Sequence, residues 1–532
     1  MSAIHVNGEP LHGSHIEQIA LGAPVHLSED VLRTAERGRH QLDHLIAERR
    51  LIYGVTTGYG PLAGRHIDPS KAGELQRNLI YHLASGTGPA LPKTTVRAIM
   101  AVRLNNLAQG HSAVRPETLE LLAQWLNNDL VPIVPARGTV GASGDLTPLA
   151  HIALALMGEA EVWDGEARTH AAAALAARGW APLNPEAKDA LALVNGTAAM
   201  TGIAALNGQA ARRCADVAMR CTVAYAECLN GRLEAWQSAL GAVRRHPGQQ
   251  EAHRRLLALS EGSERLMPAR RHYLPGELDD GAPVRDSRAI PQDPYTIRCA
   301  PQLFGAILDV IDFHNGIVDR EINAVTDNPI FYPDDDEVIH GGNFYGQHVA
   351  FAADTLTNAV TKLAVHTERM IARLTDENQN GALPAFLQGT DTGLHSGLMG
   401  AQVSASAIVA ELRSLAHPAS IQSVPTNANN QDVVTMGTIA ARKTADALTQ
   451  VHELQAIGAI TMAQGMDLLG TTDFSPASQG LRNWVRDFSL TVTTDRPLYG
   501  DIERLARALR NGSGERFMAD VRTDRSGADV VS

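Results

Sequence analysis

The sequence has few cysteines, few aromatic residues and no long apolar run, and each of these shortages excludes a class of protein. Four cysteines in 532 residues are too few for a disulfide framework. Aromatic residues make up only 4% of the chain, so the core must consist mainly of Ala, Leu, Val and Ile, of which Ala and Leu favour helices. No stretch approaches about 18 uninterrupted apolar residues, and the first residues form no signal-peptide pattern. We therefore expect a soluble, cytoplasmic, mainly α-helical protein.

Basic charge is also scarce. The formal net charge is −12 and no basic run of five or more residues occurs, which argues against nucleic-acid binding. Cys214, Cys221 and Cys228 recur every seven residues, but the outer two would lie about 21 Å apart along a helix. We interpret them as small buried residues rather than as metal ligands. His40 and His44 share a helix face, yet the pattern offers them no third ligand.

Turn and helix signals divide the first 195 residues into short elements. Ser28 followed by two acidic residues predicts the start of a helix. Asn7–Gly8 and Asp164–Gly165 each predict a hairpin turn. Further helices are expected at 70–82, 93–109, 116–128 and 147–158.

From about Asn195 onward, long Ala-rich stretches with few helix breakers predict a bundle of long helices. These stretches are 197–240, 301–327, 349–376, 399–415 and 432–468. A charged, Pro/Gly-rich passage at 267–293 interrupts them, and 332–344 is typical of a surface hairpin. We expect the domains to be 1–195, 196–512 and a flexible tail at 513–532.

The stretch RGTVGASGDLTPLAH, residues 137–151, places three glycines around one Ala-Ser pair ahead of a helix. The simplest interpretation is a turn in which Ser143 or Asp145 caps that helix. A second interpretation is chemical. If the turn is compressed, the amide nitrogen of Gly144 can approach the carbonyl carbon of Ala142. Ring closure and loss of water, including dehydration of Ser143, would leave an imidazolone with an exocyclic methylene, a strong electrophile that helix N-termini could support.

The tripeptide Ala142-Ser143-Gly144 within GTVGASGDLTPLAH resembles the signature of the aromatic amino acid ammonia-lyases and aminomutases, which form 4-methylidene-imidazol-5-one (MIO) from it. The resemblance covers nearly the whole chain, in the family's order, through YGVTTGYGPLA, LVNGT, QDPYTIRC, EINAVTDNP, HGGNFYGQH and NQDVVTMGTIAAR. It implies removal of ammonia from an α-amino acid with loss of a β-proton, giving an arylacrylate. Whether the amine or the aromatic ring attacks the methylene stays open. No metal and no external organic cofactor are expected.

The resemblance also implies a fold and an assembly. We expect an MIO-bearing N-terminal region followed by a central bundle of long helices, an architecture like that of the fumarase/aspartase superfamily. The catalytic GSSxMPxKxN loop of that group is absent, so its chemistry is excluded. The family implies a homotetramer whose active sites draw residues from three subunits, which suits long apolar helices. A non-catalytic helical scaffold is disfavoured by the intact tripeptide, Tyr53 and Arg298.

By resemblance, Tyr53 in YGVTTGYG is the base that removes the β-proton. A free tyrosine has a pKa of about 10, so a tyrosine base predicts an activity optimum on the alkaline side. The same loop is similar to a phosphate-binding loop but lacks the Gly-Lys-Ser/Thr ending. The chemistry of the motif therefore favours the base.

The remaining site residues also follow from the resemblance. Asn195 in LVNGT matches the asparagine that contacts the MIO carbonyl and the substrate amine. In QDPYTIRC, Tyr295 matches a tyrosine near the MIO group, and Arg298 matches the arginine whose planar fork holds the substrate carboxylate. The supporting residues are Gln292, which we expect to hydrogen-bond locally, Phe344, packed near the MIO group, and Asn328, which is either supporting or purely structural.

Two places indicate the substrate. His82-Leu83 occupies the pair that selects the substrate ring, where histidine-specific members resemble Ser-His, phenylalanine-specific ones usually have Phe-Leu, and tyrosine ammonia-lyases resemble His-Leu. An imidazole can hydrogen-bond a para-hydroxyl group. In NNQDVV, the neutral Gln431 beside Asn430 is typical of the phenylalanine and tyrosine branch, whereas histidine-specific members carry Gln-Glu-Asp-His there. We expect a lyase acting on L-tyrosine and also on L-phenylalanine. A tyrosine 2,3-aminomutase stays the alternative, and a histidine ammonia-lyase is disfavoured.

Overall fold

The computed structural model describes residues 2–268 and 292–512. By their contacts, the described residues divide into two compact units. Unit 1 takes them from Met1–Gln209, Phe313–Leu356 and His417–Ala445, and unit 2 from Ala210–Asp312, Thr357–Ala416 and Asp446–Ser532. The expected domains at 1–195 and 196–512 stay a prediction, and the expected tail at 513–532 lies outside the described residues, as does most of the passage at 267–293.

Four long helices contribute residues to both units. They are α9 (Ala198–Cys228), α13 (Ala300–Ile322), α14 (Gln347–Thr375) and α16 (Gly437–Leu469). Their positions confirm the expected long Ala-rich helices, with one correction. The stretch 197–240 is not one helix, because α9 stops before Asn230–Gly231, where Asn230 adopts the left-handed conformation typical of a helix C-terminus.

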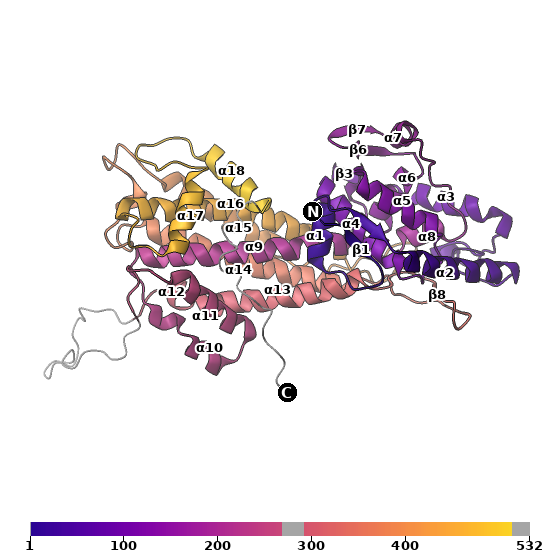
Figure 1. Cartoon of the computed structure of the whole chain (residues 1–532), viewed down its shortest axis with the longest axis horizontal. Helices are drawn as coiled ribbons and strands as arrows, with labels where there is room; N and C mark the ends of the chain where they lie inside the picture. Colours follow the sequence, from indigo (N-terminus) through magenta and orange to yellow (C-terminus); the bar gives the residue numbers. More distant parts are fainter. Residues whose placement is uncertain (1, 269–291, 513–532) are drawn as a thin grey trace. The chain divides into compact units, whose positions relative to one another are not determined.

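Helix α4 (Lys93–Ala108) is a buried helix of unit 1 and lies beside α1 (Gly13–Ala20) in Figure 1. Every residue from Val96 to Ala108 is buried, as expected for a helix that is covered on all sides. Helices α1, α2 (Glu29–Ala47) and α5 (Pro116–Asn127) pack against it. The side chain of Ser28 caps α2 by accepting a 3.3 Å hydrogen bond from the backbone of Val31, which confirms that helix start.

Three helices position the functional side chains of unit 1 by packing against one another: α3 (Ala72–Leu83), α6 (Leu146–Leu156) and α8 (Asp189–Val194). The His82-Leu83 pair ends α3, the Ala-Ser-Gly turn precedes α6, and Asn195 follows α8 directly. Residues that are distant in sequence therefore reach one place because they lie at the ends of these packed helices.

The strands of unit 1 are short and form four small sheets. The hairpin predicted at Asp164–Gly165 is confirmed, since β6 (Glu161–Asp164) pairs antiparallel with β7 (Ala167–His170) around it. The hairpin predicted at Asn7–Gly8 is wrong: β1 (Ile4–Val6) leads into α1 and pairs in parallel with β2 (Val25–Leu27) instead. The connection between two parallel strands is therefore a short helix and not a tight turn.

The other strands of unit 1, and its α-helix α7, are β3 (Thr87–Ala90), β4 (Leu130–Pro132), β5 (Pro135–Arg137), α7 (Ala171–Arg178), β8 (Ile330–Tyr332) and β9 (Glu337–Ile339).

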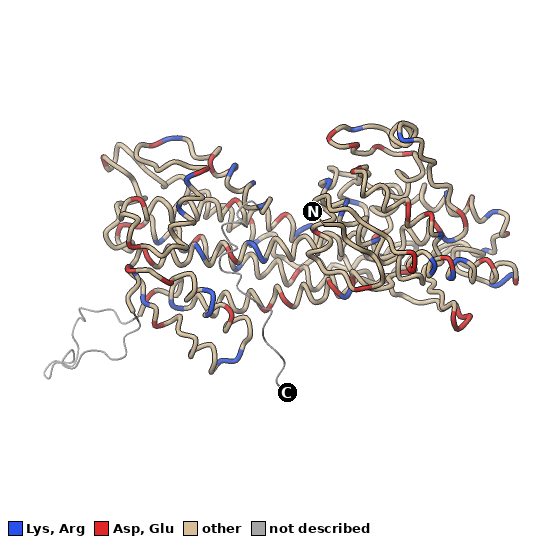
Figure 2. Tube along the Cα trace, viewed as in Figure 1, with Lys and Arg blue, Asp and Glu red and all other residues tan. Residues whose placement is uncertain are grey.

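The pair β8 and β9 confirms the surface hairpin expected at 332–344. Its turn is acidic and forms a red segment in Figure 2. Elsewhere, acidic and basic residues are mixed along the described helices rather than gathered by sign (Figure 2). None of the described helices is long and apolar enough to cross a membrane.

Unit 2 is helical. Besides its share of the long helices it contains α10 (Ser238–Arg244), α11 (Pro247–Ser260), α12 (Tyr295–Arg298), α15 (Met399–Leu415), α17 (Pro476–Arg486) and α18 (Tyr499–Arg510). Cys214, Cys221 and Cys228 are buried, which confirms their interpretation as core residues. Burial raises the pKa of the Cys214 and Cys221 thiols to about 12, so both stay protonated near neutral pH.

Candidate active site

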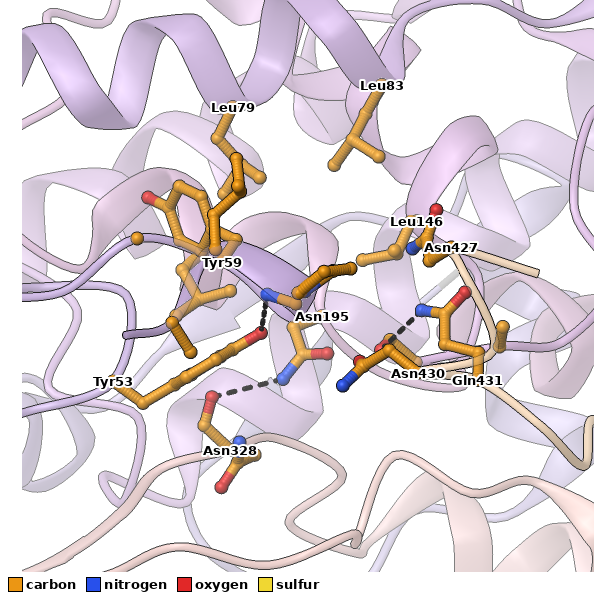
Figure 3. Close-up of a pocket in the computed structure, with 18 of the residues that line it drawn as sticks. Tyr53, Tyr59, Leu79, Leu83, Leu146, Asn195, Asn328, Asn427, Asn430 and Gln431 are labelled. Atoms are coloured by element: carbon orange, nitrogen blue, oxygen red, sulfur yellow. Dashed lines mark hydrogen bonds between the residues drawn. The ribbon is translucent and has the colours of Figure 1, made fainter. Parts of the chain in front are cut away.

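A cavity of about 1090 Å³ in unit 1 collects most of the predicted site residues (Figure 3). Those that line it are Tyr53, His82, Leu83, Ala142, Ser143, Asn195, Asn328, Phe344, Asn430 and Gln431. Gly144 follows Ser143 in the same turn. The cavity is at the upper end of the range for small-molecule sites and is larger than one amino acid needs.

The Ala-Ser-Gly turn is tight and left-handed. Ser143 has φ of 53° and Gly144 has φ of 71°, and the former is uncommon for a residue with a side chain. A Cβ atom at Gly144 would collide with the carbonyl group of Gly196, which lies against the turn. Glycine is therefore required both by the backbone conformation and by the close approach of a second chain segment.

Asp145, which follows the turn, links it by hydrogen bonds to two buried segments of the chain. Its fully buried carboxylate accepts a 2.7 Å hydrogen bond from the backbone of Met200 and another from the hydroxyl of Thr438. Asp145 occupies the N-cap position of α6, which was one of the two expected positions, but its side chain makes no capping hydrogen bond to this helix. Burial raises the pKa of Asp145 to about 6.

Three helices begin beside the turn. Asp145 precedes α6, Gly196 precedes α9, and Met436 precedes α16, where its backbone donates a 2.8 Å hydrogen bond to the carbonyl of Val140. Because helix N-termini carry partial positive charge, their convergence favours negative charge in the cavity.

Two tyrosines share the loop that borders the cavity. The hydroxyl of Tyr53 accepts a 2.9 Å hydrogen bond from the backbone of Gly60 (Figure 3), and the ring of Tyr59 lies edge-on to it at 6.3 Å between centroids. The hydroxyl of Tyr59 accepts a 2.9 Å hydrogen bond from the fully buried Gln76, which also holds the carbonyl of Gly54. Burial, with a smaller effect of Tyr53, raises the pKa of Tyr59 well above its ordinary value. Tyr59 therefore stays protonated.

The side-chain amide of Gln431 bridges Thr426 and the reactive tripeptide. Its Oε1 accepts a 2.7 Å hydrogen bond from the hydroxyl of Thr426, so its Nε2 faces the turn and donates to Ser143 Oγ at 3.4 Å (Figure 3). The side chain thus presents a hydrogen-bond donor at the reactive tripeptide, whereas a glutamate here would present only acceptors.

His82 also has a defined orientation. Its Nδ1 donates a 3.0 Å hydrogen bond to the carbonyl of Asn78, one turn earlier in α3. In the neutral ring Nε2 is then an acceptor, because only one ring nitrogen carries a proton. Leu83 beside it supplies an apolar wall.

Asn195 lies at the end of α8, above a buried charged group. Its Nδ2 donates to Asp327 Oδ1 at 2.9 Å and to the carbonyl of Asn328 at 3.2 Å. Asp327 also pairs with Lys188. Arg103 is buried nearby and donates to the carbonyl of Ala192, and burial lowers the pKa of this guanidinium to about 10.

Tyr295, Arg298 and Gln292 belong to unit 2 and do not line this cavity. The Arg298 guanidinium lies over the ring of Tyr295 at 4.4 Å, and Tyr295 is 70% exposed. Helix α12, which contains Tyr295 and Arg298, is held in place by a hydrogen bond: the indole N–H of Trp236 donates to the carbonyl of Ile297 at 2.9 Å. Gln292 is exposed.

The residues that orient the cavity's side chains are Asn78, Gln76, Thr426, Lys188 and Asp327, and none of them was predicted from the sequence. Asp327 carries one signal, because it stands next to Asn328 in the TDNP motif. The other four stand in no motif that indicates this role. Among the described residues, no group of three or more His, Cys, Asp or Glu side chains is arranged to hold a metal ion.

Comparison with known proteins yields matches over nearly the whole length. The family model described as aromatic amino acid lyase matches residues 11–488. The tyrosine ammonia-lyase of Cereibacter sphaeroides is 46% identical over 92% of this chain and 94% of its own, and the histidine ammonia-lyase of Symbiobacterium thermophilum is 42% identical over 92% and 93%. The crystal structure of a tyrosine aminomutase from Streptomyces globisporus superposes with a TM-score of 0.94, at 38% identity, over 98% of this chain and 99% of that one.

Proposed function

The chain belongs to the aromatic amino acid lyase family, and we propose that it is a tyrosine ammonia-lyase, which eliminates ammonia from L-tyrosine to give trans-p-coumarate. L-Phenylalanine, giving trans-cinnamate, is the second substrate. Overall identity does not decide between substrates, since relatives named for tyrosine and for histidine match at 46% and 42%. The observation that favours tyrosine as the substrate is the position of His82. This residue lines the same cavity as Ser143 and Tyr53, and its Nδ1 is bonded to Asn78, so Nε2 is the ring nitrogen left to accept a hydrogen bond from a ligand.

The tripeptide Ala142-Ser143-Gly144 fits the formation of MIO. Its left-handed backbone at Ser143 and Gly144, and the contact of Gly144 with Gly196, hold the chain in a compressed turn. Once formed, the group supplies an electron-poor alkene that makes the loss of ammonia possible. The N-termini of α6, α9 and α16 and the Nε2 donor of Gln431 favour negative charge next to it.

Tyr53 acts as the base that removes the β-proton. Its side chain lines the cavity together with Ser143, and a hydrogen bond from the Gly60 amide fixes the position of its hydroxyl oxygen. Tyr59 cannot replace Tyr53 as the base, because burial raises the pKa of Tyr59 and its hydroxyl stays protonated. Asn195 contacts the amine, His82 accepts a hydrogen bond from the para-hydroxyl group, and Leu83 packs against the ring.

Tyr295 and Arg298 reach the cavity from a partner subunit of a homotetramer, as the resemblance implies. The exposure of Tyr295 and the stacked position of Arg298 suit a role at a neighbour's site, where Arg298 holds the substrate carboxylate. Helices α13, α14 and α15 also leave large apolar side chains exposed, which an assembly would cover: Phe313, Phe351 and Val403 are 50%, 52% and 61% exposed.

A tyrosine 2,3-aminomutase is the second candidate, because a solved structure of that name superposes on 98% of this chain. Incubation with L-tyrosine, followed by chromatography, separates the two. A lyase accumulates p-coumarate and ammonia in equal amounts, and an aminomutase accumulates β-tyrosine. Parallel incubations with L-phenylalanine and L-histidine test the substrate, and faster turnover of histidine would contradict the proposal.

A further inference from the structure

A buried ion pair lies directly behind Asn195. Lys188 Nζ lies 2.6 Å from Asp327 Oδ2, and both side chains are almost completely buried, at 0% and 1% exposed. Burying two charges is costly, and a pair of this kind contributes little to stability compared with apolar residues of the same volume. Its position beside the cavity therefore calls for another explanation.

Asp327 links the residues at the two ends of the short helix α8. Lys188 directly precedes α8 and Asn195 directly follows it. Lys188 takes an unusual left-handed backbone conformation with φ of 73°. Asp327, from a segment more than 130 residues away, bonds both: Oδ2 to Lys188, and Oδ1 to Asn195 Nδ2 at 2.9 Å.

These contacts decide which atom of the Asn195 amide faces the cavity. Its two partners, the Asp327 carboxylate and the Asn328 carbonyl, can only accept hydrogen bonds, so the amide must turn its NH₂ group toward them. Oδ1 then lies on the opposite side, as Figure 3 shows. Asn195 consequently offers an acceptor to the cavity, while Gln431 offers a donor.

We propose that Asp327, held by Lys188, is a positioning residue that keeps Asn195 Oδ1 toward the cavity, where it accepts a hydrogen bond from the amine of the substrate. This inference rests on the proposed function, since it concerns the amine that is eliminated. Lys188 fixes which oxygen of Asp327 is left for Asn195. Without the carboxylate, only the longer hydrogen bond to the Asn328 carbonyl, at 3.2 Å, is left to orient Asn195.

The sharpest test is Asp327→Asn, which changes one oxygen into an NH₂ group at constant volume. Lys188 would attract the new amide oxygen and turn the new NH₂ group toward that of Asn195. Two donors then face each other, and Asn195 relieves this by turning over, which gives up its 3.2 Å hydrogen bond to the Asn328 carbonyl and points a donor at the substrate amine. In the double variant Lys188→Met/Asp327→Asn the competing ammonium is gone, and the backbone N–H of Asn328, which donates to Oδ1 of residue 327 at 2.7 Å, keeps the amide oxygen on the side of Asn195.

We expect Asp327→Asn to lower kcat/KM for L-tyrosine about 100-fold, the loss typical of a preorganised hydrogen-bonding group. In the double variant, kcat/KM for L-tyrosine should be at least about tenfold higher than in Asp327→Asn. Inhibition by p-coumarate, which has no amine, changes less than about threefold in both variants. Intact mass keeps the deficit of two waters that MIO formation produces. Glu227→Gln, which neutralises a fully buried carboxylate in unit 2, is the matched control and changes kcat/KM less than about threefold.

Four results would overturn the proposal: turnover by Asp327→Asn within threefold of the unmodified chain, p-coumarate binding weakened in proportion to turnover, no recovery in the double variant, or loss of the mass deficit. If the unmodified chain deaminates another amino acid, the proposed function fails. The positioning role is then tested with that amino acid and its own arylacrylate.

Discussion

The backbone amide of Gly60 donates a 2.9 Å hydrogen bond to the hydroxyl oxygen of Tyr53. The neighbouring Tyr59 hydroxyl also accepts one hydrogen bond, from Gln76, but it is enclosed by protein. One loop thus presents two phenols of the same chemistry in different surroundings. Both tyrosines line the cavity, but burial raises the pKa of Tyr59, so Tyr59 keeps its proton and Tyr53 is the candidate base.

Replacing Tyr53 with phenylalanine should therefore remove the base while leaving the cavity intact. We expect kcat for L-tyrosine to fall by about 10²- to 10⁴-fold, the usual contribution of a general base, with little change in KM. Tyr59→Phe is the matched control, and it should lower kcat less than tenfold while costing about 1 kcal/mol of stability through the lost Gln76 bond. Steady-state kinetics of both variants check this. Equal losses in the two would remove Tyr53 from its proposed role.

Ser143→Ala should abolish formation of the electrophile, because alanine has no hydroxyl to lose. The intact mass of the unmodified chain should lie two waters below the mass of its translated sequence, and the variant should lack the water that Ser143 loses. Activity should fall by about 10⁴-fold or more, as when other enzymes lose a reactive group. An unmodified chain of full translated mass would contradict the proposal at its root.

His82→Phe should shift the preference from L-tyrosine toward L-phenylalanine. The variant loses the Nε2 acceptor for the para-hydroxyl group and leaves that hydroxyl unpaired in an apolar surrounding. We expect the ratio of kcat/KM for tyrosine to that for phenylalanine to fall at least about tenfold, equivalent to about 1.4 kcal/mol. An unchanged ratio would show that His82 only fills space.

Protonation of His366 should destabilise unit 2 in acid. Its ring is buried, which lowers its pKa to about 4 although Nε2 donates to the carbonyl of Thr296 at 2.9 Å. Between about pH 6.5 and pH 4 the unfolded chain binds a proton at this residue and the folded chain does not, so stability falls as the pH falls, by up to about 3 kcal/mol.

His366→Gln keeps a donor for Thr296 but cannot be protonated. Denaturant unfolding at a series of pH values should show a shallower loss of stability for the variant across this range. His314 and His452 are buried as well, with pKa values lowered to about 4, so part of the slope should persist. A slope identical to that of the unmodified chain would contradict the assignment.

The sequence predicts secondary structure well where the signal is local. The Ser28 cap, the Asp164–Gly165 hairpin and the helices beginning near residues 93 and 116 all depend on neighbours a few residues apart. The Asn7–Gly8 hairpin was wrong because pairing of β1 was decided by a distant strand, β2, and not by the turn. Asp145 stands at the N-cap position of α6 as expected, but distant residues take its side chain: the carboxylate accepts hydrogen bonds from Met200 and Thr438 and makes none to α6.

By itself, the sequence determined the helical character of the chain, the reactive tripeptide and the identities of the residues around it, because spacing and residue type are properties of the chain. The tertiary structure decided what those residues present to a ligand. Asn195 turns an oxygen to the cavity because Asp327 can only accept hydrogen bonds, and His82 keeps Nε2 as an acceptor because the carbonyl of Asn78 takes the proton of Nδ1. An amide or imidazole carries both a donor and an acceptor, and only its folded partners choose between them.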